Sequence, residues 1–390
     1  MPIVNRVADL QPDIQAWRRD LHEHPELLYD VHRTASFVAD RLREFGCDEV
    51  ATGLGRTGVV GVIKGRKPVG DGDVRVIGLR ADMDALPIQE AGNAAYASKT
   101  PGKMHACGHD GHTAMLLGAA RYLAETRNFA GDAVVIFQPA EEGGAGAAAM
   151  IQDGLMDRFG IDQVYGMHNG PGIPVGSFAI RSGAIMASTD DLDIQIEGHG
   201  GHAARPHLCI DSVLVGAQLI TALQSIVARS VDPLESAVIS MCEFHAGNAR
   251  NVIPQTATLK GTVRTLNPKV RELVEKRLRE VVAGVAQITG AKIDLTYRRN
   301  YPVLVNPAAQ TERAAEVARE VAGIANVHEM PPLMGAEDFA YMLQARPGAF
   351  IFCGNGDSAG LHHPAYDFND EAIVFGTSYW IKLVENTLAA

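Results

Sequence analysis

The stretch VRVIGLRADMD, Val74–Asp84, decides the fold class of this chain, because it joins a buried strand directly to a pair of carboxylates. Its first seven residues, VRVIGLR, have the mostly apolar character that is typical of a buried strand in a parallel sheet. In an open parallel sheet, ligands bind beyond the carboxyl ends of the strands. Asp82 and Asp84 follow the strand at that end, so the stretch predicts both an α/β sheet and the edge where its chemistry lies.

Strand and helix patterns alternate on either side of this stretch. Two further apolar runs, Ala133–Gln138 and Gln163–His168, predict buried strands. Helices are expected over Gln15–Leu27, His32–Gly46 and Gly111–Thr126, the second of them amphipathic and closed by its glycine. Strands that alternate with helices favour a mostly parallel mixed sheet with helices on both faces.

The pattern changes near residue 187. The run Asp191–Gly198 alternates apolar and polar residues, as a half-exposed strand does. A helix, two strands, a long amphipathic helix and a last strand follow, which gives the order βαββαβ over residues 187–300 and predicts a ferredoxin-like α+β domain. A helical run and the buried strand run Gly348–Gly356 come after it. We therefore expect the second domain to be inserted into a discontinuous first domain, residues 1–186 and 301–390.

Length, charge and cysteine content limit the possible partners. A chain of 390 residues is too long for one average core, so two domains are expected. The formal net charge is −11 and no Lys/Arg run occurs, so we expect neither nucleic-acid binding nor attachment to an anionic membrane. The N-terminal stretch lacks an apolar signal core, and no apolar run approaches the roughly 18 residues of a membrane span. Five scattered cysteines without a CxxC pair favour reduced thiols in the cytoplasm.

Side chains of the kinds that bind metals follow each of four predicted strands of the first domain. They are Asp82 and Asp84, Glu141 and Glu142, His168, and His362 and His363. The stretch HACGHDGH, His105–His112, adds one cysteine and three histidines just before a helix. Chance polar loops explain any one of these clusters, but all of them together favour a single site.

The residue types in this set favour a metal ion over other uses of cysteine and histidine. A structural zinc site normally shows two close ligand pairs, and the chain has no second cysteine pair. A redox thiol at Cys107 would need a resolving cysteine nearby, and the sequence has none. Taken alone, Cys107 and His109 would be interpreted as a buried thiol and a satisfied histidine. Together with glutamate they suit borderline-soft divalent ions such as zinc, or manganese, cobalt or nickel.

Glu141 and Glu142 follow an apolar strand and a proline, and they precede the small and apolar segment GGAGAAAM. A solvated acidic pair is therefore the weaker interpretation. Adjacent side chains are not expected to point the same way here. One carboxylate can then bind metal while its neighbour holds a water, as metal-assisted hydrolysis requires. Asp82 and Asp84 are expected to orient the ligands rather than to bind metal themselves.

The second domain carries its own candidates. The glycine-rich turn EGHGGHAARP, Glu197–Pro206, has two histidines just past a strand, and it is either a solvent loop or a turn that approaches another surface closely. Asn251 and Arg264 are candidates to bind a substrate carboxylate. Arg264 is equally compatible with an exposed position on a strand.

Eight ordered motifs resemble those of a known family. They are RADMDALP, KMHACGHDGHTAML, FQPAEEGGAGA, GMHN, GHGGHAARPH, NVIP, GAEDFAYM and LHHPAYDFND, and the similarity runs from RRDLHEHPEL nearly to the C-terminus. The chain resembles the aminoacylase/carboxypeptidase G group of co-catalytic metallohydrolases, and within it the branch of hippurate hydrolases and indole-acetyl-amino-acid hydrolases. The resemblance implies a catalytic α/β domain and a ferredoxin-like lid that often dimerises.

The resemblance also implies roles for individual residues. By motif position, two divalent ions would be held by Cys107, His109, Glu142, His168 and His362, with Cys107 as the bridge. His362 is preferred to His363 because the residue between the ligand and the proline varies in this branch. Glu141 would be the general base. His202, from the same chain or a partner subunit, would polarise the scissile carbonyl.

The reaction implied by the resemblance is hydrolysis of the amide bond of N-acyl-amino acids to a carboxylic acid and a free amino acid. Asn251 and Arg264 would hold the carboxylate on the amine side, and the enzyme would form a homodimer or higher homo-oligomer through the lid. A dipeptidase or an N-carbamoyl-amino-acid hydrolase on the same scaffold is the alternative. Two departures from the family pattern, His199 in place of a common lysine and Ala336 in place of a small hydroxyl residue, leave the acyl preference open.

Overall fold

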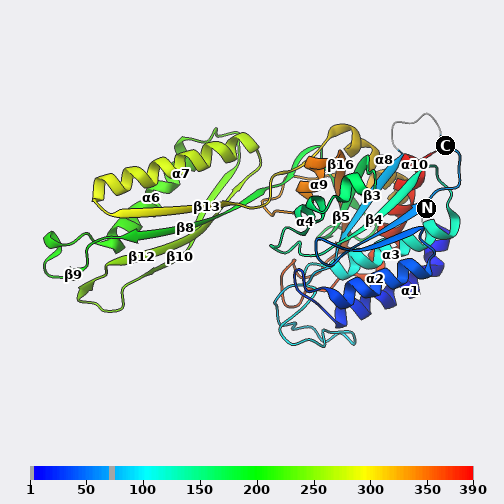
Figure 1. Ribbon diagram of the computed structural model, residues 1–390, viewed down its shortest axis with the longest axis horizontal. Helices are drawn as coiled ribbons and strands as arrows, with labels where there is room; N and C mark the ends of the chain where they lie inside the picture. The colour runs from blue at the N-terminus through cyan, green and yellow to red at the C-terminus, as the bar shows by residue number, and fades with distance from the viewer. Residues whose placement is uncertain (1–3, 70–74, 390) are drawn as a thin grey trace. The chain divides into compact units, whose positions relative to one another are not determined.

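The computed structural model describes residues 4–69 and 75–389, so Met1–Ile3 of the N-terminal stretch and Val74 of the predicted strand lie outside the described residues. The chain forms two units (Figure 1). The first consists of Met1–Gly183, Val305–Pro331 and Asp338–Ala390, and the second of Ala184–Leu304 and Pro332–Glu337. The main segment of the second unit starts and ends close to the predicted limits 187 and 300. The return of Pro332–Glu337 to that unit had no signal in the sequence.

An eight-stranded mixed sheet organises the first unit, in the order β1-β2-β4-β3-β5-β16-β6-β15. Its strands are Glu49–Leu54 (β1), Gly58–Lys64 (β2), Val76–Asp82 (β3), Asp132–Gln138 (β4), Gln163–Pro171 (β5), Phe178–Ile180 (β6), Val327–Glu329 (β15) and Gly348–Gly356 (β16). The central strands β4, β3, β5 and β16 run parallel, so their carboxyl ends meet at one edge (Figure 1). The predicted α/β class with a mostly parallel mixed sheet is confirmed.

Helices cover both faces of this sheet. Neighbouring residues of β5 point to opposite faces and contact one layer each. Met167 packs toward Gly376 of one layer, whereas Gly166 faces Phe339 of the other. The first layer contains α1 (Asn5–Glu23), α2 (His32–Glu44), α3 (His109–Thr126), α8 (Ala308–Ala322) and α10 (Ile373–Thr387). The second contains α4 (Gly146–Gln152) and α9 (Phe339–Ala345), with α5 (Leu155–Arg158) packed on α4.

The first helix differs from its prediction at both ends. It starts at Asn5 rather than Gln15, because Val7, Leu10 and Ile14 continue its buried stripe toward the N-terminus. It ends at Glu23, since Pro25 disfavours helical backbone in the residue before it.

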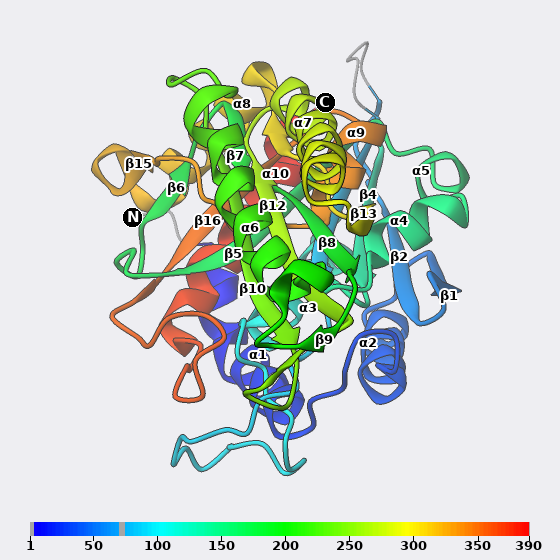
Figure 2. The ribbon, with the colours of Figure 1, turned by 90° about the vertical axis from the view of Figure 1, so that its left-hand side faces the viewer.

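The second unit contains a four-stranded antiparallel sheet in the order β10-β12-β8-β13. Along the chain its elements are β8 (Ser188–Glu197), α6 (Ser212–Arg229), β10 (Ala237–Ala246), β12 (Thr256–Thr265), α7 (Pro268–Thr289) and β13 (Lys292–Arg299), which is the βαββαβ order. Helices α6 and α7 lie side by side against the sheet (Figure 2). A two-stranded pair, β9 (Gly201–His202) and β11 (Val252–Ile253), extends from it, and β7 (Gly183–Met186) and β14 (Leu304–Asn306) lie where the chain passes between units.

Among the described residues one helix, α6, is long and apolar enough by composition to cross a membrane. One such helix is weak support for a membrane span. Its residues Val215, Leu219 and Leu223 are buried in the apolar core of the second unit, which is the usual position of a core helix in a folded domain.

Candidate metal centre

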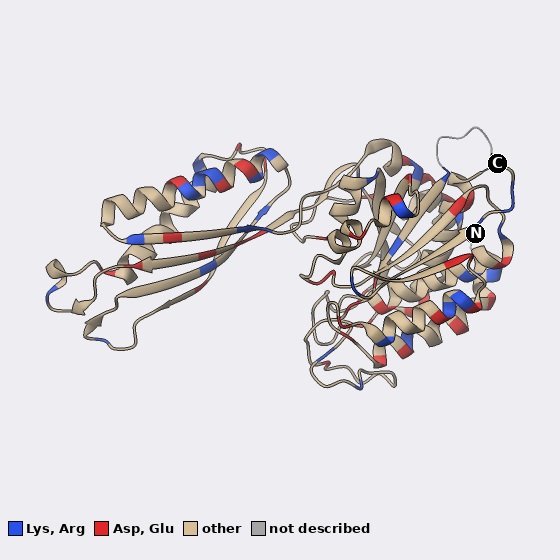
Figure 3. Cartoon of the chain, in the orientation of Figure 1, with Lys and Arg blue, Asp and Glu red and all other residues tan. Residues whose placement is uncertain are grey.

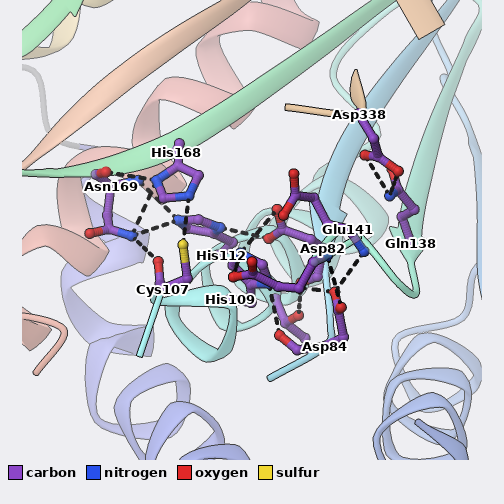
Figure 4. A network of polar contacts seen from close by, with 12 residues as sticks. Asp82, Asp84, Cys107, His109, His112, Gln138, Glu141, His168, Asn169 and Asp338 are labelled. Atoms are coloured by element: carbon purple, nitrogen blue, oxygen red, sulfur yellow. Dashed lines mark hydrogen bonds and ion pairs between the residues drawn. The ribbon is translucent and has the colours of Figure 1, made fainter. Parts of the chain in front are cut away.

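The carboxyl ends of the parallel strands bring the candidates of the first unit into one cluster (Figure 4). Asp82 ends β3, Glu141 follows β4, and Cys107 and His109 lie at the start of α3. His168 differs from its prediction, because it lies within β5 rather than at its end. The strand continues to Pro171, since its last residues still pair with β16.

Two groups of possible ligand atoms share the thiol of Cys107. His109 and His168 complete one group, and Glu142 and His362 complete the other, with the ligand atoms of each group within 4.8 Å of one another. The Sγ atom of Cys107 lies 3.4 Å from Nε2 of His168, and Oε1 of Glu142 lies 3.3 Å from Nε2 of His362. The five residues that the resemblance implied thus come together, with Cys107 in the position that a bridging ligand would need.

The hydrogen bonds of two histidines leave their Nε2 atoms for this cluster. Nδ1 of His109 donates to the carbonyl of Asp84 at 2.8 Å, and Nδ1 of His168 donates to the carbonyl of Asn169 at 2.7 Å, because a carbonyl oxygen can only accept. Nε2 of His109 and Oε1 of Glu142 are buried, and their contacts with the described residues are ion pairs of 3.3 to 3.9 Å rather than well-formed hydrogen bonds. Buried polar atoms without hydrogen bonds cost free energy, so these atoms fit the ligand positions of a cation.

The electrostatics of the cluster favour a cation as well. Burial and the charges of Glu142, Glu141 and Asp82 raise the pKa of the Cys107 thiol well above its ordinary value. Burial alone would lower the pKa of His109, but the charge of Asp82, a hydrogen bond to Asp84 and the charge of Glu142 outweigh it and raise that pKa to about 10. A bound divalent ion displaces such protons from thiol and imidazole ligands. Thiolate, imidazole and carboxylate together suit borderline-soft divalent metals.

Asp84 and Asp82 contact the residues around the cluster. The two carboxylate oxygens of Asp84 accept the backbone N–H groups of Glu141 at 2.9 Å and of Glu142 at 3.1 Å. Asp82 pairs with Nδ1 of His112 at 2.7 Å (Figure 4). It also accepts from the Arg80 guanidinium at 2.8 Å. The contact of Asp84 with Glu142 is of the kind that orients a metal ligand, whereas these Asp82 contacts reach none of the five candidate ligands.

Glu141 and Glu142 both point toward His109, contrary to the expectation that these adjacent side chains diverge. Carboxylate oxygens of both residues lie within 4.8 Å of a ring nitrogen of His109. Adjacent side chains alternate along a strand, but this segment is a turn, with φ of 55° at Ala140 and 95° at Gly143. The bend of the backbone brings two neighbouring carboxylates to one place.

Asn169 makes contacts at the site that were not expected from the sequence. Its side-chain amide donates to the carbonyl of Cys107 at 2.6 Å, and its backbone N–H donates to Nε2 of His112 at 2.9 Å. The hydroxyl of Tyr366 donates to the Asn169 side chain at 2.8 Å. Asn169 therefore ties the cysteine loop to β5. The signals in the sequence were a polar residue directly after the predicted strand Gln163–His168 and its place in the motif GMHN.

In the second unit, His202 and Asn251 lie together and Arg264 lies apart. His202 of β9 pairs with Val252 of β11, and the carbonyl of Asn251 accepts the N–H of Ala203 at 3.1 Å. The side chain of His202 is exposed and its Nδ1 accepts the N–H of Ala204 at 3.1 Å, so the ring proton is on Nε2. Arg264 lies near the other end of β12, about 27 Å along the strand from Thr256 at roughly 3.4 Å per residue.

The chain is similar to known proteins over nearly its whole length. The family model described as Peptidase family M20/M25/M40 matches residues 78–386. A hippurate hydrolase from Campylobacter jejuni is 44% identical over 98% of both chains, and an N-acetylcysteine deacetylase from Bacillus subtilis is 40% identical over 94% of both chains. The crystal structure of the Bacillus subtilis YXEP protein, described as a dinuclear metal binding peptidase from the M20 family, has 35% identity and a TM-score of 0.84, over 98% of this chain and 99% of that one. The family resemblance is therefore confirmed: the chain belongs to Peptidase family M20/M25/M40 and is a metal-dependent hydrolase of that family.

Proposed function

We propose that the enzyme hydrolyses the amide bond of N-acyl-amino acids of the hippurate type, with two divalent ions at its active site. The observation that carries this proposal is the buried cluster in which Cys107 lies between two groups of ligand atoms, with Glu141 beside it. The names of two relatives support the substrate class, because one describes hydrolysis of hippurate and the other removal of the acetyl group from N-acetylcysteine.

The residues of the chain would divide the reaction among them. Cys107 would hold one ion together with His109 and His168, and the other together with Glu142 and His362. Divalent ions bound there supply Lewis-acid polarisation and a lowered pKa for water. Glu141 takes the proton of the attacking water and later gives it to the leaving amine. The Nε2–H of His202 donates to the carbonyl oxygen as that atom gains negative charge.

A substrate panel tests this proposal. Metal-reconstituted protein is assayed with benzoyl-glycine, N-acetyl-amino acids, dipeptides and N-carbamoyl-amino acids, each with zinc, manganese, cobalt or nickel. Turnover of the first two substrates supports the proposal. Turnover of dipeptides or carbamoyl compounds alone supports the alternative on the same scaffold, and no turnover with any metal contradicts both.

A variant of the proposed base tests the mechanism. Glu141→Gln should retain its metal by elemental analysis and lose about 10²- to 10⁴-fold in kcat, since that is the usual contribution of a general base. Glu49→Gln is a matched control, because Glu49 is half-exposed and pairs with Arg158 on the surface. Near-full activity of Glu141→Gln would show that another group takes the proton.

We propose that the active form is a homodimer in which His202 and Asn251 come from the partner subunit. Asn251 and Arg264 of the same chain cannot bind one carboxylate together, because most of the length of β12 separates them. Helix α6 offers an apolar surface for a second copy: Val213 is 41% and Leu214 56% exposed. The outer face of α7 is densely charged by comparison (Figure 3).

Mixing two inactive variants tests the shared site. If His202 acts from the partner subunit, His202→Ala mixed with Glu141→Gln regains activity, because some mixed dimers hold one complete site. If His202 acts within its own chain, the mixture stays inactive. Light scattering of Leu214→Glu should show monomers if α6 forms the interface, and an unchanged dimer would place the interface elsewhere.

We also propose a cytoplasmic location. All five cysteines are free, as expected of a protein in a reducing compartment. Cell fractionation with an antibody to the protein would test this, and recovery from an extracellular or periplasmic fraction would contradict it.

A further inference from the structure

The turn that carries Glu141 and Glu142 has a backbone that its residues do not favour by themselves. Ala140 has φ of 55° and Ala145 φ of 56°, so two alanines adopt the left-handed region on either side of the glutamates. The Cβ atom makes this region unfavourable for any residue except glycine. Such conformations persist where the surrounding structure holds them, and they occur preferentially at functional sites.

Contacts from two separate segments hold this turn. Asp84 binds the N–H groups of Glu141 and Glu142, as described above. The second segment is Leu28–Tyr29, between α1 and α2. The carbonyl of Leu28 accepts the N–H of Ala140 at 3.1 Å, and the hydroxyl of Tyr29 donates to the carbonyl of Gly144 at 2.7 Å.

The ring of Tyr29 also lies directly against the turn. A Cβ atom placed on Gly144 would be 3.2 Å from the Tyr29 ring and 2.6 Å from the Cβ of Ala140. There is thus no room for a larger residue between the ring and the turn. The peptide of Gly144 is held closely against the tyrosine.

Tyr29 is itself fixed by the β1–β2 hairpin. The hydroxyl of Thr57 donates to the carbonyl of Tyr29 at 2.9 Å, and the guanidinium carbon of Arg56 lies 4.2 Å from the centre of the tyrosine ring. A tyrosine that is held by the hairpin can restrain the turn instead of moving with it.

We propose that Tyr29 is a positioning residue for Glu141. Its hydroxyl holds the carbonyl of Gly144, and this keeps the turn in the conformation that directs the Glu141 carboxylate toward His109. The inference rests on the proposed role of Glu141 as the general base. Four of the five candidate ligands lie outside this turn, so loss of the Tyr29 hydroxyl should lower kcat without releasing metal.

The test is Tyr29→Phe, which removes the hydroxyl and keeps the ring. We expect kcat for the best substrate of the panel to fall about five- to tenfold, the usual effect of one lost hydrogen bond, with KM and metal content unchanged. Tyr96→Phe is a matched control, because the Tyr96 hydroxyl also donates to one protein oxygen, of Asp367 at 2.7 Å, but contacts no part of the turn. It should keep its kcat.

A second variant separates positioning from a general loss of structure. Ala145→Gly makes the left-handed conformation intrinsically acceptable, so the turn then depends less on Tyr29. The ratio of kcat with and without the Tyr29 hydroxyl should therefore be smaller in the Ala145→Gly background than in the native one. A purely structural role of the hydroxyl would leave this ratio unchanged.

The results that would contradict the positioning role of Tyr29 differ from those that would contradict the proposed function. If the native enzyme turns over its substrate, Glu141→Gln does not, and Tyr29→Phe equals the native enzyme in kcat, the positioning role is wrong while the function stands. Loss of metal from Tyr29→Phe would overturn it too, because the hydroxyl would then support the ligands. A native enzyme inactive on the whole panel would instead contradict the proposed function.

Discussion

Replacement of Asp84 by asparagine should loosen the turn of the two glutamates while the size of the side chain stays the same. In the native site each carboxylate oxygen of Asp84 accepts one backbone N–H, from Glu141 at 2.9 Å and from Glu142 at 3.1 Å. An asparagine side chain has only one acceptor oxygen, so one of these N–H groups must face an NH₂ group. A buried donor left without a partner costs about 1–3 kcal/mol, and we expect about 2 kcal/mol here.

Hydrogen exchange of a peptide that covers Pro139–Gly146 measures this cost locally. A loss of about 2 kcal/mol in the free energy of local opening corresponds to roughly 30-fold faster exchange, since each 1.36 kcal/mol is a factor of ten. The same variant should have a lower kcat, because Glu141 is less well held. Local exchange is the better readout than global unfolding, since a chain of two units need not unfold in one step.

Asp162→Asn is the control for this experiment. Asp162 also accepts two consecutive backbone N–H groups, of Arg75 at 2.8 Å and Val76 at 2.9 Å, but both bind the same oxygen. An asparagine can keep both bonds, so exchange near β3 should change little. Unchanged exchange of the glutamate turn in Asp84→Asn would refute the reasoning, and so would an equally large effect in Asp162→Asn.

Chelation of the metal should abolish hydrolysis, and readdition of zinc, manganese, cobalt or nickel should restore it; activity that survives complete metal removal, verified by elemental analysis, would contradict a metal-dependent mechanism. Gly108→Ala should lower both stability and metal content, because a Cβ atom would lie 2.3 Å from Nδ2 of Asn169 and φ is 87° at this residue. Overpacking alone costs about 1–3 kcal/mol. Chemical denaturation and metal analysis test this, and an unchanged unfolding free energy with unchanged metal content would contradict it. Burial alone would lower the pKa of His22, but the charge of Asp110 and hydrogen bonds to Asp110 and Glu90 raise it to about 9. Because this pKa lies above the unfolded value of about 6.5, the stabilisation is complete below pH 6.5 and is lost as the pH rises through 9. The unfolding free energies of the native protein and of His22→Gln should therefore converge by about 3 kcal/mol between these two pH values. A difference that stays constant with pH would contradict the raised pKa.

The buried ion-pair cluster around His22 shows where sequence patterns stop being informative. His22 lies in the last turn of α1, one residue before the helix ends at Glu23. In the structure it is 1% exposed and lies 2.7 Å from Asp110, which also pairs with the fully buried Arg18 at 2.9 Å. Burial of α1 on this side depends on segments that are distant in sequence, Tyr96 and Asp367 among them, and no local periodicity reports their arrival.

Local patterns did predict which residues gather at the candidate site. Apolar runs identify β3, β4, β5 and β16, and parallel strands bring their carboxyl ends to one edge whatever the details of packing. Polar side chains at those ends therefore meet almost by necessity. Residue types alone then indicated a site for a borderline-soft metal, since thiol, imidazole and carboxylate are its ligands.

Only the tertiary structure decided how these groups face one another. The common direction of Glu141 and Glu142 depends on backbone torsions in a turn, and the restraint by Tyr29 depends on a hydrogen bond across 115 residues of chain. The separation of Asn251 from Arg264 follows from the length and register of β12. Strand-end chemistry is local and is therefore readable in the sequence. Backbone torsions that distant partners hold cannot be predicted in this way, because local sequence patterns do not show which distant segments contact each other.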